Sequence, residues 1–264
     1  MTKTRYYFAS IFQLLTGMRP RSLIMRFFLR LPTPSNPVIS LPRQAVRLKV
    51  RGVMDIWSIK ETFLDRFYER FGTAVSAGWT VMDIGGGIGD YTLFAARSQP
   101  QVQVHAFEPF PQSFSLLQDN LSLNQAENAH AYPFAVWHQP GPLLIDASAG
   151  EPGQFISRSI SDGATASQKV LVEAIPLAEA FDKAGVDRCD LLKVDCEGAE
   201  YPIFFHTPVD ILQRIDRIVM EYHDNITEYT HNDLVKFLAE RGYIVRTYPN
   251  FAHHYLGYLY AFRK

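Results

Sequence analysis

The stretch VMDIGGGIGDYTLFAA, residues 81–96, predicts a buried strand, a glycine-rich turn and the start of a helix. Its glycines lie at positions 85, 86, 87 and 89. Glycine adopts left-handed backbone conformations readily, and it lets a ligand approach main-chain atoms that a Cβ would block. The helix that follows directs unsatisfied N–H groups toward such a ligand. This combination is typical of sites that bind a nucleoside cofactor.

Two acidic residues at strand ends indicate which nucleoside cofactor the site binds. The strand VQVHAFEP reaches Glu108, 25 positions after Asp83, where an acidic residue meets ribose hydroxyls in such folds. A dinucleotide fingerprint starting at Gly85 needs a small residue where Asp90 stands, which argues against a nicotinamide-dependent oxidoreductase. S-adenosylmethionine carries an ammonium group, a sulfonium and a ribose, so it suits both carboxylates. The predicted cofactor site comprises Asp83, Gly85, Gly87, Gly89 and Glu108, with Pro109, Phe110, Ala135 and Val136 as walls around the adenine.

Strand and helix signals alternate from Thr80 onward, which predicts a parallel sheet with helices on both faces. The last two expected strands, within residues 243–249 and 256–264, have no helix between them, so the final strand should run antiparallel. The sequence therefore predicts an α/β fold with the Rossmann-like, seven-stranded sheet of class I S-adenosylmethionine methyltransferases. Residues 142–149 and 169–177 are expected to pair as a hairpin insertion, with a polar loop at 150–168.

The charge of the chain is unevenly distributed. Residues 1–60 contain eleven Lys and Arg residues against Asp55 alone, although the whole chain of 264 residues has a net charge of -1. We predict a basic amphipathic extension over residues 1–45, with a Pro-rich linker at 31–42, and a methyltransferase domain over 46–264. Residues 1–30 could contact a membrane surface or a second copy of the chain, or could pair with the acidic remainder. A nucleic-acid partner is not expected.

The chain carries no uncharged apolar run of the ~18 residues that a membrane-spanning helix requires, and Arg5 argues against a signal peptide. We therefore expect a cytoplasmic protein. Cys189 and Cys196 lack metal-ligand spacing and are expected to be reduced thiols.

Further acidic residues follow the later strands. Because ligands of an open α/β sheet bind beyond the carboxyl ends of its strands, Asp195, Glu197, Glu221 and His223 are predicted to meet there as catalytic residues. Methyl transfer to a hydroxyl requires alignment and the removal of one proton. His223 could take that proton during attack, as a general base. Asp195 and Glu197 are expected to position the substrate or the loop; alternatively, they could hold a hard divalent cation together with Glu221.

Four segments together resemble the FkbM family of S-adenosylmethionine-dependent methyltransferases: VMDIGGGIGDYT, FEPFPQSFSLLQDNLSLN, DLLKVDCEGAE and IVMEYH, in this order within residues 50–264. The chain has Gly86 and Gly87 where the family commonly has Ala-Asn. The resemblance implies methyl transfer to a hydroxyl of a saccharide or other natural product. It implies cofactor roles for Asp83, Gly85, Gly87, Gly89 and Glu108, and an acidic cluster of Asp195, Glu197 and Glu200. The alternative is a non-catalytic module of the same fold that binds a partner or membrane through its basic N-terminus.

Overall fold

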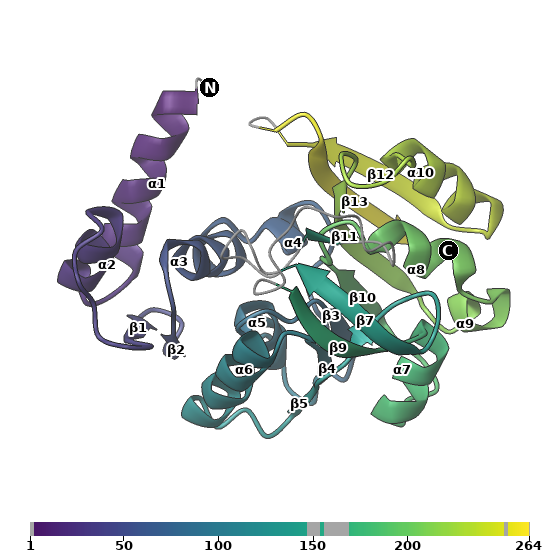
Figure 1. Ribbon diagram of the computed structural model, residues 1–264, viewed down its shortest axis with the longest axis horizontal. Coiled ribbons are helices and arrows are strands. Elements are labelled where there is room, and N and C mark those ends of the chain that lie inside the picture. Colours follow the sequence, from purple (N-terminus) through teal and green to yellow (C-terminus); the bar gives the residue numbers. More distant parts are fainter. Residues whose placement is uncertain (1–2, 147–153, 156–168, 251–252, 264) are drawn as a thin grey trace.

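The computed structural model describes residues 3–146, 154–155, 169–250 and 253–263 of the chain. Its centre is a seven-stranded sheet of order β12-β13-β11-β10-β3-β4-β5 (Figure 1). The strands β11, β10, β3, β4 and β5 are parallel, and β13 lies antiparallel between β11 and β12. Their bounds are β3 (Thr80–Ile84), β4 (Gln103–Phe107), β5 (Ala129–Tyr132), β10 (Leu191–Val194), β11 (Arg217–His223), β12 (Ile244–Pro249) and β13 (Leu256–Phe262). This confirms the predicted sheet and its antiparallel last strand.

Two apolar layers cover the sheet, because side chains alternate between its faces along each strand. Met82 and Ile84 of β3 pack on the face covered by α7 (Leu177–Ala184), α8 (Glu200–His206), α9 (Val209–Gln213) and α10 (His231–Glu240). Val81 faces the opposite side, with α4 (Phe67–Arg70) and α5 (Asp90–Ala96). On that side, α6 (Pro111–Leu123) packs with the N-terminal elements.

The helical segment upstream of the sheet is broken. α3 (Val53–Lys60) continues into one π-helical turn, η1 (Glu61–Asp65), and α4 begins after Arg66. Arg66 has a left-handed backbone, with φ of 54°, so the chain changes direction there. This break turns Tyr68 toward the carboxyl end of β10.

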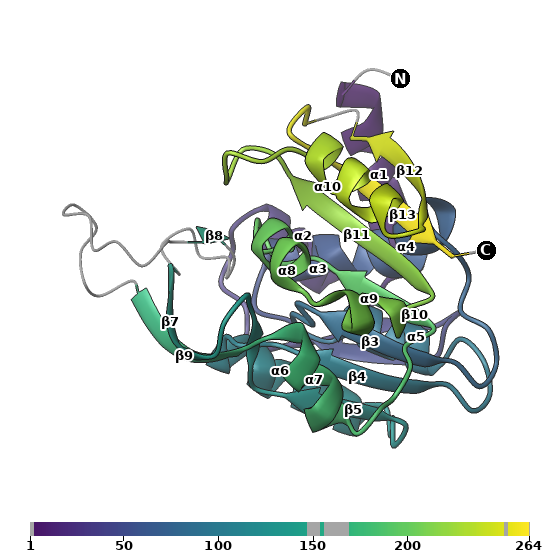
Figure 2. The same ribbon diagram turned by 90° about the vertical axis from the view of Figure 1, so that its right-hand side faces the viewer.

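A smaller sheet of order β6-β9-β7-β8 lies beside the main one. β7 (Gly141–Asp146) and β9 (Lys169–Ile175) pair antiparallel, as the hairpin prediction required, and extend away from the main sheet in Figure 2. Ala135 and Val136 form β6 (Ala135–Val136), paired with β9, and do not continue β5. The predicted loop at 150–168 lies outside the described residues except for β8 (Gln154–Phe155).

The N-terminal extension is part of the core, which corrects the predicted linker and domain boundary. Inside residues 31–42, β1 (Val38–Leu41) pairs antiparallel with β2 (Val46–Lys49), so a boundary at 45/46 would cut this hairpin. α1 (Lys3–Gly17) and α2 (Arg21–Phe28) lie at one end of the molecule (Figure 1). Their buried Leu14 and Ile24 belong to the same apolar cluster as Leu117 of α6. Among the helices described, none combines the length and apolar character needed to cross a membrane.

Candidate active site

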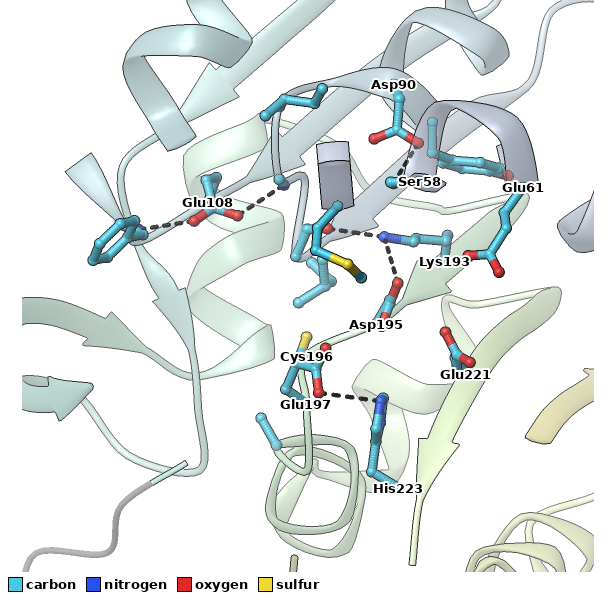
Figure 3. A pocket seen from close by; sticks show the side chains of 18 of the residues that line it. Ser58, Glu61, Asp90, Glu108, Lys193, Asp195, Cys196, Glu197, Glu221 and His223 are labelled. Atoms are coloured by element: carbon cyan, nitrogen blue, oxygen red, sulfur yellow. Dashed lines mark hydrogen bonds and ion pairs between the residues drawn. The ribbon is translucent and has the colours of Figure 1, made fainter. Parts of the chain in front are cut away.

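One cavity of about 790 Å³ opens at the carboxyl ends of the central strands (Figure 3). It extends from the glycine turn after β3 to His223 at the end of β11 and Tyr258 of β13. Its size falls within the range of about 300–1,000 Å³ that small-molecule sites occupy. The place agrees with the rule that open α/β sheets bind ligands beyond their strand ends.

The glycine turn is pressed between two neighbouring elements. A Cβ on Gly85 would lie 1.9 Å from the Asp195 carbonyl oxygen, and Gly85 has φ of +80°. Gly87, with φ of +55°, faces open space, and both glycines line the cavity. Gly89 does not line it: with φ of +86° it precedes α5, and its Cβ position is closed by Leu117. Only glycine allows main-chain atoms to form this wall.

Glu108 anchors the turn and forms part of the cavity wall. Its carboxylate accepts the N–H groups of Gly87 and Phe110, each at 2.8 Å. The side chain is nearly buried, and this burial raises the pKa of Glu108 to about 7 although both hydrogen bonds oppose the rise. Pro109, Phe110, Ala135 and Val136 line the cavity as well, so the structure brings the predicted ribose and adenine residues together.

Asp83 does not line the cavity. It is fully buried, 3.0 Å from the ammonium of Lys193, and its other oxygen accepts the Thr92 hydroxyl at 2.7 Å. Lys193 also donates to the Gly85 carbonyl at 2.8 Å. Burial would lower the pKa of Lys193, but Asp83 and Asp195 outweigh it and hold the pKa above its usual range. A contact of Asp83 with the cofactor's ammonium therefore stays a prediction, because the carboxylate already has these two partners.

Asp195 follows β10 and faces the cavity. Tyr68 of α4 donates its hydroxyl to Asp195 Oδ2 at 2.7 Å, and Lys193 Nζ lies 3.8 Å from the same oxygen. The side chain of Asp195 is 26% exposed, so it remains accessible from the cavity. Nothing in the sequence around Tyr68 distinguishes it from the aromatic core residues of the same segment.

His223 is held between the carboxylates of Glu200 and Glu197, and Figure 3 shows its contact with Glu197. Its Nδ1 lies 3.1 Å from Glu200 Oε1, and its Nε2 lies 3.4 Å from Glu197 Oε2. Glu200 is fully buried and also accepts the N–H groups of Cys196 and Gly198, so it supports the loop rather than lining the cavity. Burial would lower the pKa of His223, but Glu200 and Glu197 outweigh it and raise the pKa to about 10.

Two further carboxylates line the same part of the cavity. Burial raises the pKa of Glu221 well above its usual range, and Asp195 adds to this. Glu61 accepts the indole N–H of Trp57 at 2.8 Å, and burial raises its pKa to about 7. The sequence analysis did not single out Glu61, because it lies in a helical segment that carries other acidic residues, Asp65 and Glu69, as well. All four predicted catalytic residues, Asp195, Glu197, Glu221 and His223, line this cavity.

Comparison with known proteins gives a consistent picture. The family model described as the methyltransferase FkbM domain matches residues 83–245, more than half of the chain. This range begins at Asp83 and includes Glu108, Asp195 and His223.

This chain matches most of the length of two curated relatives. "Methyltransferase 1" of Beauveria bassiana is 27% identical over 184 residues, covering 63% of this chain and 72% of the relative. The "31-O-demethyl-FK506 methyltransferase FkbM" of Streptomyces tacrolimicus is 25% identical over 232 residues, covering 78% of this chain and 88% of the relative. The solved structure of methyltransferase FkbM from Methylobacillus flagellatus KT has a TM-score of 0.51 at 14% identity, covering 78% of this chain and 53% of that chain. This structural likeness supports the fold.

Proposed function

Since this chain belongs to the FkbM methyltransferase family, we propose that it transfers a methyl group from S-adenosylmethionine to a hydroxyl of a saccharide or other small natural product. The observation that carries the proposal is the continuity of one cavity, from the glycine turn and Glu108 to the carboxylates beyond β10 and β11. The Streptomyces relative supports an oxygen acceptor, because its name specifies an O-demethyl substrate.

The cofactor half of the cavity is assigned to the residues around the glycine turn. Gly85 and Gly87 offer main-chain atoms to the ligand, and the Glu108 carboxylate is placed to accept ribose hydroxyls. Ala135 and Val136 supply an apolar surface for the adenine. S-adenosylmethionine, when bound, supplies a methyl carbon activated by its sulfonium. The role of the chain is then to align the acceptor oxygen with that carbon and to receive one proton.

We assign the proton acceptor to Glu221 in its ionised form, because the burial that raises the pKa of Glu221 makes that form a stronger base than an ordinary carboxylate. The carboxylates on both sides of the His223 ring favour an imidazolium, which donates hydrogen bonds and takes up no further proton. Asp195 already accepts the Tyr68 hydroxyl, and Glu197 faces His223. In the proposed step the hydroxyl oxygen bonds to the methyl carbon, the carbon–sulfur bond breaks, and the hydroxyl proton passes to Glu221.

Two measurements test this function. Titration calorimetry with S-adenosylhomocysteine should show binding that weakens at least tenfold in Glu108→Ala and is unchanged in Glu127→Ala, an exposed glutamate outside the cavity. Incubation of hydroxylated acceptors with methyl-labelled S-adenosylmethionine should place the label in an ether. A label recovered on nitrogen or carbon would contradict the proposed reaction, and unchanged affinity in Glu108→Ala would contradict the cofactor site.

The N-terminal helices support a second, separate proposal: contact with an anionic membrane surface. The exposed apolar side chains of these helices and of the residues directly after α2 are Ile11, Phe12, Met25, Leu29 and Leu31, and Phe12 is 70% exposed. Exposed Arg21, Arg26 and Arg30 lie in the same segment, which has no acidic residue. Apolar side chains interspersed with arginines are the composition that binds the interface of anionic bilayers.

A further inference from the structure

We propose that Asp195, Glu197 and His223 bind a divalent cation of the Mn²⁺ or Mg²⁺ type. We further infer that this cation holds the acceptor's hydroxyl oxygen beside Glu221; this second step rests on the proposed function.

The positions of the three side chains suit one ion. One carboxylate oxygen each from Asp195 and Glu197 and one ring nitrogen of His223 all lie within 4.8 Å of one another. Oxygen ligands bind Mg²⁺ or Ca²⁺ at about 2.0–2.6 Å, so ligand atoms of one ion lie within about 4–5 Å of each other. Mn²⁺ accepts carboxylate oxygens, and imidazole is a common ligand of transition metals. The loop after β10 supplies two ligands and the end of β11 supplies the third.

His223 is oriented in advance by a residue outside the set. Glu200 is fully buried, is fixed by the N–H groups of Cys196 and Gly198, and contacts Nδ1 of His223 at 3.1 Å. The ring is 5% exposed, and Nε2 is the nitrogen that points toward Glu197 (Figure 3). A carboxylate on the far nitrogen of a histidine is the usual support of a metal-binding imidazole. A bound cation would replace the proton on Nε2.

The negative charge around Asp195, Glu197 and His223 also favours a bound cation. Asp195, Glu197, Glu221 and Glu61 all line this part of the cavity. The ammonium of Lys193 lies 3.8 Å from Asp195, but it is already bound to Asp83 and to the Gly85 carbonyl. A divalent ion at Asp195, Glu197 and His223 would offset the mutual repulsion of these carboxylates, and it would acidify a hydroxyl that reaches its open side.

The site predicts which acceptors are preferred. A hard cation with three protein ligands retains open positions, and a hydroxyl with a second oxygen on the adjacent carbon can fill two of them. We therefore expect vicinal diols and α-hydroxy carbonyl compounds to be methylated faster than isolated alcohols.

Electron paramagnetic resonance of the full-length chain titrated with Mn²⁺ tests the cation site without requiring an acceptor. We expect one bound Mn²⁺ per chain and a loss of affinity of at least tenfold in Asp195→Asn and His223→Ala. Glu200→Gln should weaken binding by about 10- to 100-fold, since it acts through the ring. His130→Ala, an exposed histidine on β5, is the matched control and should bind as the wild type. Thermal melting of each variant establishes that it is folded.

The outcomes separate the cation from the methyl transfer. Wild-type protein that binds S-adenosylhomocysteine but no Mn²⁺ at millimolar concentration overturns the cation site and leaves the proposed function intact. Equal Mn²⁺ affinity in wild type and folded His223→Ala overturns the ligand set. Binding of Mn²⁺ without any binding of S-adenosylhomocysteine contradicts the proposed function and supports the cation site. Methylation that is abolished by chelator and restored by Mn²⁺ supports both.

Discussion

Lys193 and Asp83 stand side by side on neighbouring parallel strands, with the Lys193 ammonium 3.0 Å from Asp83 Oδ1. The same ammonium holds the Gly85 carbonyl at 2.8 Å. One buried cation therefore fixes both the end of β3 and the first residue of the glycine turn. The strand-end aspartate Asp83 therefore supports the glycine turn from behind, and Glu108 is the acid that lines the cavity beside this turn.

Removal of Lys193 should destabilise the fold strongly. Lys193→Met leaves the fully buried carboxylate of Asp83 without its cation, and breaking a buried pair in this way costs about 3–5 kcal/mol. Urea unfolding followed by circular dichroism measures the loss. The double variant Asp83→Asn, Lys193→Met should be more stable than Lys193→Met, because it removes the orphaned charge. Arg188→Met, which breaks the exposed pair with Asp216, should change the stability little. Equal losses in Lys193→Met and Arg188→Met would contradict this account.

Cofactor affinity should depend on pH through Glu108. Its pKa is raised to about 7, so the carboxylate is largely protonated at pH 6 and ionised at pH 8. The ionised form accepts ribose hydroxyls better, and hydrogen bonds to charged groups exceed neutral ones by about 1 kcal/mol, or roughly fivefold in affinity. Calorimetry with S-adenosylhomocysteine should therefore show binding that tightens from pH 6 to pH 8. In Glu108→Gln this dependence should disappear; the same slope in that variant would assign it to another group.

The glycine turn should tolerate no side chain at position 85. Gly85→Ala places a Cβ 1.9 Å from a backbone oxygen that cannot move away, and we expect a loss above ~4 kcal/mol, or no soluble protein. Gly78→Ala is the matched control, because Gly78 has a similar φ of +75° but open space around its Cβ. Gly78→Ala should lower the free energy of unfolding by only about 1–2 kcal/mol, the cost of placing a residue with a Cβ in a left-handed backbone conformation. Thermal or urea unfolding measures the loss of stability in both variants. Similar losses in Gly85→Ala and Gly78→Ala would show that glycine is required at position 85 by its backbone conformation and not by the contact with the Asp195 carbonyl.

Vesicle co-sedimentation should detect the proposed membrane contact. Full-length protein should bind phosphatidylglycerol vesicles and not pure phosphatidylcholine vesicles, and Phe12→Ser with Leu29→Ser should lose binding, because both side chains are at least 60% exposed. Point variants are needed, since truncation at residue 46 would remove β1 and buried core residues. Loss of self-association in the double variant, with no vesicle binding by wild type, would instead assign this surface to a second copy of the chain.

Much of the fold could be predicted because its signals are local. The alternation of strands and helices and the missing helix before β13 are periodic patterns, and they specify the sheet that the structure contains. The predicted linker was wrong for Val38–Leu41, because pairing of β1 with β2 is a tertiary event that Pro-rich composition conceals. The break at Arg66 likewise has no local signal in an otherwise helical apolar pattern.

The sequence alone determined which residues reach the carboxyl ends of the strands, because the hydrophobic periodicity predicts the strands and the glycine spacing predicts the turn. It thereby placed Glu108, Asp195, Glu221 and His223 at one cavity. Only the tertiary structure decided what each group does there. Asp83 became the partner of Lys193, and His223 became a ring held by Glu200. Charge state and availability depend on burial and on neighbours distant along the chain, and these neighbours are set only when the sheet is assembled.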